Sequence, residues 1–207
     1  MSEFSTAGLN VSALEIWRGE NRLFSNLSFE LGGGEIAIIT GGNGTGKTTL
    51  LRILAGLSLP AKGIVTWRDK DVRIFTPEAR VGIVYQGHLE GLKKDLTVVE
   101  NLEFYRSLWM TNSPVAALLE ELGLATLADI QVRYLSAGQR RRVALGCMRL
   151  RQAQLWLLDE PFTNLDAAGT KIVAGWLASH AESGGTAVVA THLADNLSGK
   201  VAVEVEL

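Results

Sequence analysis

Residues 41–48 read Gly-Gly-Asn-Gly-Thr-Gly-Lys-Thr and fit the pattern G-x-x-x-x-G-K-[ST] in full. Glycines in such a loop let successive backbone N–H groups turn toward phosphate oxygens. A helix that begins near Lys47 directs the positive end of its dipole at the same anion. Lys47 is expected to reach the β- and γ-phosphates, and the Thr48 hydroxyl to ligate Mg²⁺. The predicted nucleotide-binding residues are Gly41, Gly42, Asn43, Gly44, Thr45, Gly46, Lys47, Thr48 and Thr49.

Two adjacent carboxylates follow a short apolar run elsewhere in the chain. Residues 155–158 read Leu-Trp-Leu-Leu, and Asp159 and Glu160 come directly after them. Beside a phosphate loop, Asp159 suits the shell of a magnesium ion. Glu160 suits the carboxylate that orients and polarises an attacking water. We therefore expect Lys47 and Glu160 to take part in hydrolysis of a bound nucleotide.

These residues need strands and helices to position them. Residues 36–39 and 155–158 are continuous apolar runs, as expected of strands buried on both faces. Buried strands that alternate with helices, after antiparallel strands at the front, indicate an α/β chain. Alternating apolar residues predict two further strands, one at Leu9, Val11 and Ala13 and one at Leu27, Phe29 and Leu31. More strands are expected at residues 64–67, 82–85, 186–190 and 201–207. Helices are expected at 48–57, in short pieces over 97–127, and at 136–150.

Composition narrows the class of protein. A length of 207 residues fits one domain with a small subdomain. The chain has 20 basic and 22 acidic residues, so it has no excess of positive charge for wrapping nucleic acid. With 47% hydrophobic and 20% charged residues the chain is not disordered. The longest charge-free stretch, residues 107–119, has 13 residues, short of the ~20 that span a membrane. The amino terminus lacks a signal-peptide pattern, and the single Cys147 fits a reducing compartment.

The segment Tyr-Leu-Ser-Ala-Gly-Gln at residues 134–139, which we call the signature segment, precedes the helix expected at 136–150. Alone it would be a serine N-cap with small residues behind it. Together with the two sites above, it resembles the L-S-G-G-Q signature of ATP-binding-cassette (ABC) ATPases. The other marks of that family follow in order, with Gln86 like the glutamine of its Q-loop, residues 163–166 like its D-loop and His192 like its switch histidine.

The resemblance implies a P-loop NTPase fold, with a RecA-like parallel sheet flanked by helices, an N-terminal antiparallel β subdomain and an inserted helical subdomain at about 87–145. It makes residues 1–207 a single ABC ATPase domain. It also implies that two copies pair head to tail around ATP, so that Asp166 crosses the interface. Site residues implied by the resemblance are Ser136, Gly138 and Gln139 on the nucleotide of the other copy, His192 with Glu160 and Lys47 in catalysis, and Gln86 with Thr48 and Asp159 at Mg²⁺.

The position that stacks on adenine departs from the family pattern. An aromatic residue is usual about 23 residues before the first glycine of the loop, and here that position is Arg18, next to Trp17. A guanidinium can stack on a base, and so can an indole. Trp17 and Arg18 both stay candidates.

Several related classes can be set aside. A GTPase would carry N-K-x-D after a strand, and the chain has no such motif. Chromosome-type cassettes insert a long coiled coil between Q-loop and signature, whereas Gln86 and Leu135 are only 49 positions apart in this chain. Translation-type cassettes usually occur as two on one chain. The ATPase subunit of a membrane transporter remains, with integral membrane permease subunits on separate chains.

Residues 85–102 are similar to the ATP-binding subunit of bacterial haem exporters for cytochrome c maturation, through their G-H-x-x-G-L-K stretch. That similarity implies a peripheral ATPase at the cytoplasmic face of the bacterial inner membrane. No direct haem binding is predicted, and His88 is expected to pack or hydrogen-bond. The alternatives are the ATPase subunit of another small-substrate ABC transporter and a soluble regulatory ABC ATPase.

The sequence also predicts two properties of the protein surface. The charge-poor block at 97–127 is expected to dock a membrane partner, which would explain part of the high mean hydropathy of +0.16. The run Arg140, Arg141 and Arg142 is expected on a solvated or interface-facing helix, because its side chains point in different directions. No nucleic-acid partner is therefore predicted.

Overall fold

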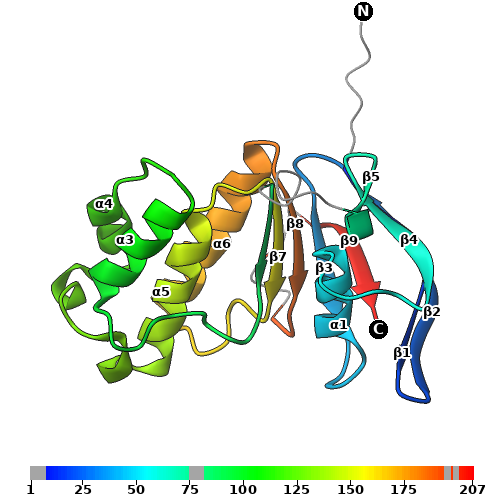
Figure 1. The fold of residues 1–207 in the computed structure, drawn as a ribbon, viewed down its shortest axis with the longest axis horizontal. Helices are drawn as coiled ribbons and strands as arrows, with labels where there is room; N and C mark the ends of the chain where they lie inside the picture. The colour runs from blue at the N-terminus through cyan, green and yellow to red at the C-terminus, as the bar shows by residue number, and fades with distance from the viewer. Residues whose placement is uncertain (1–7, 75–81, 194–196, 198–200) are drawn as a thin grey trace, which may run out of the picture.

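The computed structural model describes residues 8–74, 82–193, 197 and 201–207, arranged as two sheets and several helices (Figure 1). One sheet is antiparallel with strand order β2-β1-β4-β5, and the other is parallel with order β6-β7-β8-β3-β9. The strands are β1 (Leu9–Arg18), β2 (Asn21–Leu31), β3 (Ile36–Thr40), β4 (Lys62–Trp67), β5 (Lys70–Asp71), β6 (Ile83–Gln86), β7 (Leu155–Asp159), β8 (Thr186–Ala190) and β9 (Val201–Glu206).

The helices divide between the two sides of the parallel sheet. Figure 1 shows α1 between the two sheets, and the remaining α-helices beyond the other face of the parallel sheet. The predicted α/β class with an N-terminal antiparallel sheet is confirmed. The helices are α1 (Lys47–Leu54), α3 (Val98–Leu108), α4 (Val115–Glu121), α5 (Ala137–Arg149) and α6 (Ala167–Glu182), with 3-10 turns η1 (Val72–Ile74), η2 (Ala125–Leu127) and η3 (Val132–Tyr134).

The parallel sheet is buried on both faces, which explains its continuous apolar runs. In β3, Ile36 and Ile38 join the core beneath α3 to α6, whereas Ala37 and Ile39 join the core around α1 and the antiparallel sheet. Strand β7 is buried along its whole length. Two cores that share one sheet therefore account for much of the high mean hydropathy.

The antiparallel sheet departs from the predicted alternation at Ala13. The pairing of β1 with β2 shifts register between Val11 and Leu14, and Ala13 has φ 48°. Ala13 is therefore exposed, and burial resumes at Leu14 and Ile16. A bulge adds one residue to a strand and reverses the faces beyond it.

The prediction of short helical pieces over 97–127 is confirmed. Helix α4 begins after Pro114, and Gly123, which follows it, has φ 65°. Helix α3 begins with a capping box, in which Thr97 and Glu100 satisfy each other's backbone N–H groups. The helical subdomain bounds of 87–145 stay a prediction. Within the described ranges, no helix is long and apolar enough to cross a membrane.

Helix α6 was not expected from the sequence. It is the longest helix in the described part of the chain, and Asp166 caps it by accepting a hydrogen bond from Gly169 N at 2.8 Å. The predicted D-loop residue therefore has a local role as an N-cap.

Candidate nucleotide-binding site

The loop at residues 41–46 connects the end of β3 to the start of α1. Gly41 has φ 136°, and a Cβ there would lie 2.4 Å from the carbonyl oxygen of Leu207. Gly46, the N-cap of α1, has φ 115° and provides no side-chain acceptor for the helix. The first N–H groups of α1 therefore receive no cap from a side chain, and an anion can serve as their acceptor.

Lys47 lies inside the curve of this loop. Its side chain is buried, and its Nζ donates to the carbonyl oxygens of Gly41 and Gly42 at 2.7 and 2.9 Å. The helix has no acidic residue in its first turn. Positive charge therefore accumulates at this end of α1, where the helix dipole already favours an anion.

Thr48 and Asp159 meet at the carboxyl end of the parallel sheet. The Thr48 hydroxyl donates to Oδ2 of Asp159 at 2.7 Å, although the residues are 111 positions apart. Asp159 is 1% exposed. A hydroxyl beside a carboxylate fits a divalent cation such as Mg²⁺, which prefers oxygen ligands and takes one or two carboxylates plus substrate phosphates.

Glu160 has a strained backbone and an unsatisfied side chain. Its φ is 47°, in a region that non-glycine residues rarely occupy and that often marks functional sites. Its buried Oε1 has no hydrogen-bond partner among the described residues, and lies 3.4 Å from Nε2 of His192. The same Nε2 lies 3.4 Å from Nζ of Lys47. A buried carboxylate oxygen without a donor favours binding a water molecule.

Apart from His192, the side chains described above line a cavity of about 270 Å³. Arg18 lies in its wall, whereas Trp17 is not among the described lining residues and donates to Glu15 instead. Leu23 and His88 also line the cavity, and neither was assigned to it from the sequence. The lining residues are Arg18, Leu23, Asn43, Gly44, Gly46, Lys47, Thr48, Thr49, His88, Asp159 and Glu160.

The signature segment lies outside this cavity. Ser136 caps α5 through a capping box with Gln139, and Ser136 is exposed. Gly138 is required locally, because a Cβ there would lie 2.5 Å from the carbonyl oxygen of Asn164. None of Ser136, Gly138 and Gln139 lines the cavity as far as the described residues define it.

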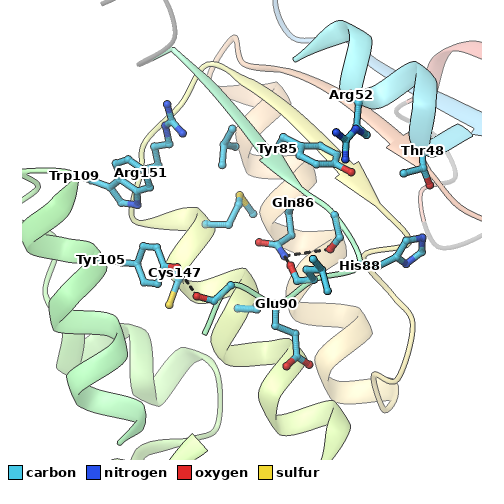
Figure 2. Close-up of a pocket in the computed structure, with 16 residues that line it drawn as sticks. Thr48, Arg52, Tyr85, Gln86, His88, Glu90, Tyr105, Trp109, Cys147 and Arg151 are labelled. Carbon is cyan, nitrogen blue, oxygen red and sulfur yellow. Dashed lines mark hydrogen bonds between the residues drawn. The ribbon is translucent and has the colours of Figure 1, made fainter. Parts of the chain in front are cut away.

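Gln86 lies in a second depression, a groove of about 450 Å³ beside the cavity. Its amide donates to the carbonyl oxygens of Gly87 and Leu89 at 3.3 and 3.2 Å, as Figure 2 shows. Its role at Mg²⁺ stays a prediction. The other groove residues come from α1, β6, residues 87–91, and α3 and α5 with the residues that follow these two helices: Thr48, Arg52, Val84, Tyr85, Gly87, His88, Leu89, Glu90, Gly91, Tyr105, Trp109, Ala144, Cys147, Met148 and Arg151.

Arg141 corrects the expectation of a solvated arginine run. It is 5% exposed, and its guanidinium donates to the carbonyl oxygens of Gly87, Asp159 and Glu160 at 3.1, 2.9 and 2.9 Å. Burial lowers the pKa of this guanidinium, and the nearby carboxylate of Glu90 opposes that shift. Arg141 thus fixes the backbone on which both predicted carboxylates sit. Only a tertiary contact could have revealed this role.

Comparisons with known proteins identify the family to which the chain belongs. Residues 24–163 match the ABC transporter family model. The chain is 43% identical to the cytochrome c biogenesis ATP-binding export protein CcmA of Nitrosomonas europaea, over 89% of this chain and 88% of the relative. It is 46% identical to the protein of that name from Escherichia coli K12, over 84% of each chain.

Solved structures agree on the fold. The ATP-binding subunit of an ABC transporter superposes with a TM-score of 0.83 at 22% identity, covering 96% of this chain and 85% of that one. An ABC transporter cassette in its ADP conformation superposes with a TM-score of 0.74 at 23% identity, covering 93% and 84%.

Proposed function

The chain belongs to the ABC transporter family of ATP-binding subunits, and on that premise we propose that it hydrolyses ATP for a membrane complex of cytochrome c biogenesis. As a member of this family it is an ATPase. The relatives carry the words cytochrome c biogenesis and export in their names, and we extend that process to this chain. The ATP would drive haem delivery or release of a haem-loaded chaperone.

One observation carries the chemical part of the proposal. Lys47, Thr48, Asp159, Glu160 and His192 come from three separate parts of the chain and meet at one end of the parallel sheet. Hydrolysis of a phosphoanhydride needs a cation at the phosphates, a metal shell and a positioned water. This cluster offers a group for each requirement.

Thr48 and Asp159 would hold Mg²⁺, which neutralises charge that develops on the phosphate oxygens. Their two oxygens are 2.7 Å apart. Lys47 would exchange the carbonyl oxygens of Gly41 and Gly42 for phosphate oxygens, since its ammonium is already inside the loop. The uncapped N-terminus of α1 would receive a further phosphate oxygen.

Glu160 would bind and orient the attacking water through Oε1. The atom is buried without a hydrogen-bond donor in the part of the chain that the structure describes, so a water O–H is its natural partner. His192 lies 3.4 Å from that atom and also 3.4 Å from Nζ of Lys47. It would therefore keep the water in line with the phosphate that Lys47 holds.

A second copy of the chain would complete the site. Ser136 and Gly138 lie at an exposed helix N-terminus outside the cavity, and a helix N-terminus of this kind is suited to a phosphate. In a head-to-tail pair, the signature segment of one copy would cover ATP bound by the other. Asp166 would lie near the contact between copies while it caps α6.

The groove would receive a cytoplasmic segment of the membrane permease, with the complex at the inner membrane of a bacterium. Leu89 on its edge is 89% exposed, and Met110, next to the lining residue Trp109, is 91% exposed. Large apolar side chains this exposed are typical of protein contact surfaces. The groove also lies against the nucleotide cavity, with Thr48 and His88 in both walls.

Membrane retention tests this assembly. Leu89→Asp should lower the amount of chain that co-purifies with a small integral membrane subunit by about tenfold or more, because it buries a charge in an apolar contact. Ile74→Asp is the matched control, since Ile74 is 77% exposed but lies in η1, outside the groove. Nucleotide affinity of both variants is measured in parallel. Equal retention of the two variants would contradict the docking proposal.

A further inference from the structure

The backbone at Glu160 turns two successive carbonyl groups toward one side chain. Nη2 of Arg141 donates to the carbonyl oxygens of Asp159 and Glu160, each at 2.9 Å. Glu160 has φ 47°, a left-handed conformation that a non-glycine residue keeps only where its surroundings hold it. Because both oxygens carry partial negative charge, they repel each other where they converge, and a cationic donor between them offsets that repulsion. Arg141 therefore stabilises this conformation directly.

The guanidinium itself is held in one orientation. Arg141 is 5% exposed, and its Nη1 donates to the carbonyl oxygen of Gly87 at 3.1 Å. Since the group is planar, hydrogen bonds from both terminal nitrogens fix its rotation as well as its position. The backbone N–H of Glu160 donates to Ala190 at 2.8 Å, and its carbonyl also accepts from the N–H of Thr163 at 3.2 Å. Arg141 adds a rigid side-chain support to these backbone hydrogen bonds.

The same conformation determines where the Glu160 carboxylate lies. The two peptide planes beside a Cα atom set the direction of its side chain and the rotamers open to it. At Glu160 they bring Oε1 to a buried position 3.4 Å from Nε2 of His192. A misplacement of about 1 Å in a reacting group can lower a rate by about a hundredfold. Arg141 is not among the described residues that line the nucleotide cavity, so its influence on a water held there would pass through the Glu160 backbone.

We propose that Arg141 is a positioning residue for ATP hydrolysis, which holds the left-handed backbone of Glu160 and thereby directs its carboxylate at the attacking water. This deepens the proposed function and rests on it, because it takes the role of Glu160 as given. In this role the guanidinium contacts neither the phosphates nor the metal. Its removal should therefore lower the rate of hydrolysis and leave the affinity for ATP unchanged.

Hydrolysis rate and ATP affinity of the purified full chain test this role. Arg141→Met keeps the side-chain length but no donor, so kcat should fall by about ten- to a hundredfold. Arg141→Lys keeps a charged donor but not the planar fork, so kcat should fall by about three- to tenfold. The Kd of a fluorescent ATP analogue should stay within about twofold in both variants. Arg149→Met, on the same helix and outside the described wall of the cavity, is the matched control and should behave as the wild type.

A second background separates positioning from a general structural role. In a chain that carries Glu160→Gln, the further change Arg141→Met should lower the residual single-turnover rate by less than about twofold, because the carboxylate that Arg141 directs is already gone. A residue that only stabilises the fold would lower the rate by the same factor in both backgrounds. Thermal unfolding is recorded for every variant, and Arg141→Lys is compared in the two backgrounds should Arg141→Met fail to fold.

Three results would overturn the role of Arg141. The first is a wild-type kcat in folded Arg141→Met or Arg141→Lys. The second is an equal loss of rate with and without Glu160→Gln. The third is a parallel loss of kcat and ATP affinity, which would mean that the whole cavity changes. Each leaves the wild-type chain an ATPase, whereas a wild-type chain that did not hydrolyse ATP would remove the proposed function and this inference with it.

Discussion

The nucleotide cavity and the groove share Thr48 and His88 but differ in construction. The cavity is formed by backbone turns and polar side chains at the ends of β3 and β7, with Gly46 and Glu160 at positive φ. The groove adds apolar side chains, such as Tyr105, Trp109 and Met148, beside polar and charged ones. A site for a charged ligand needs hydrogen-bond donors at defined positions, whereas a docking surface needs mainly apolar area.

This difference predicts how each region responds to substitution. In the cavity, substitutions that change one functional group should alter the rate of hydrolysis or the affinity for ATP by large factors, while the fold persists. In the groove, single changes should alter stability or partner binding by smaller factors and leave hydrolysis chemistry intact.

Glu160→Gln should lower the rate of ATP hydrolysis by about a hundredfold or more, because the amide cannot act as a base toward the water. ATP binding should persist and an ATP-bound pair of chains should accumulate. Phosphate release and size-exclusion chromatography measure the two effects. Glu120→Gln, at an exposed carboxylate on α4, is the control, and full turnover by Glu160→Gln would remove the assigned role.

Lys47→Ala should weaken ATP binding by about ten- to a hundredfold, since it removes charge-assisted hydrogen bonds to phosphate. Isothermal titration or a fluorescent nucleotide measures the affinity. Lys62→Ala is the matched control, because Lys62 forms an exposed ion pair with Glu15 at 3.2 Å, and such pairs contribute little. Equal affinities for the two variants would mean that residues 41–48 do not hold the phosphates.

The thiol of Cys147 should be nearly inert in the folded chain although it lines the groove. Cys147 is 4% exposed, and burial raises the pKa of its thiol. Each unit of rise lowers the thiolate fraction about tenfold, so a thiol reagent at mildly alkaline pH should react at least about tenfold more slowly than with the denatured chain.

The same shift makes folding stability depend on pH. The folded state retains the proton that the unfolded thiol loses, so this contribution is complete below the unfolded pKa and declines as pH rises above it. In the labelling experiment, rapid reaction of Cys147 in the folded chain would contradict this burial and would mean that the groove around Cys147 opens.

The local motifs predicted much of the site. Residues 41–48 were assigned correctly to a turn between a strand and a helix, because glycine spacing and a helix start are local properties. The capping serine of α5 was likewise found from its own segment. Helix α6 was missed, since its apolar residues are interrupted by Gly169 and Gly175 and show little periodicity.

Long-range contacts could not be predicted from spacing. The burial of Arg141 depends on three carbonyl oxygens supplied by two other segments. The choice between Trp17 and Arg18 depended on a strand whose faces reverse at the Ala13 bulge, and Arg18 is the one in the cavity wall. The stacking role of Arg18 stays a prediction.

The phosphate loop, the adjacent carboxylates and the α/β class could be predicted from local sequence, because each depends on a few contiguous residues and their backbone preferences. The tertiary structure alone decided which distant groups meet there. Thr48 and His88 both contact Oδ2 of Asp159 only because β6 and β7 end, and α1 begins, at the same edge of the parallel sheet. Parallel strands bring their carboxyl ends together whatever their separation in the chain, and that geometry places the cavity beside the groove.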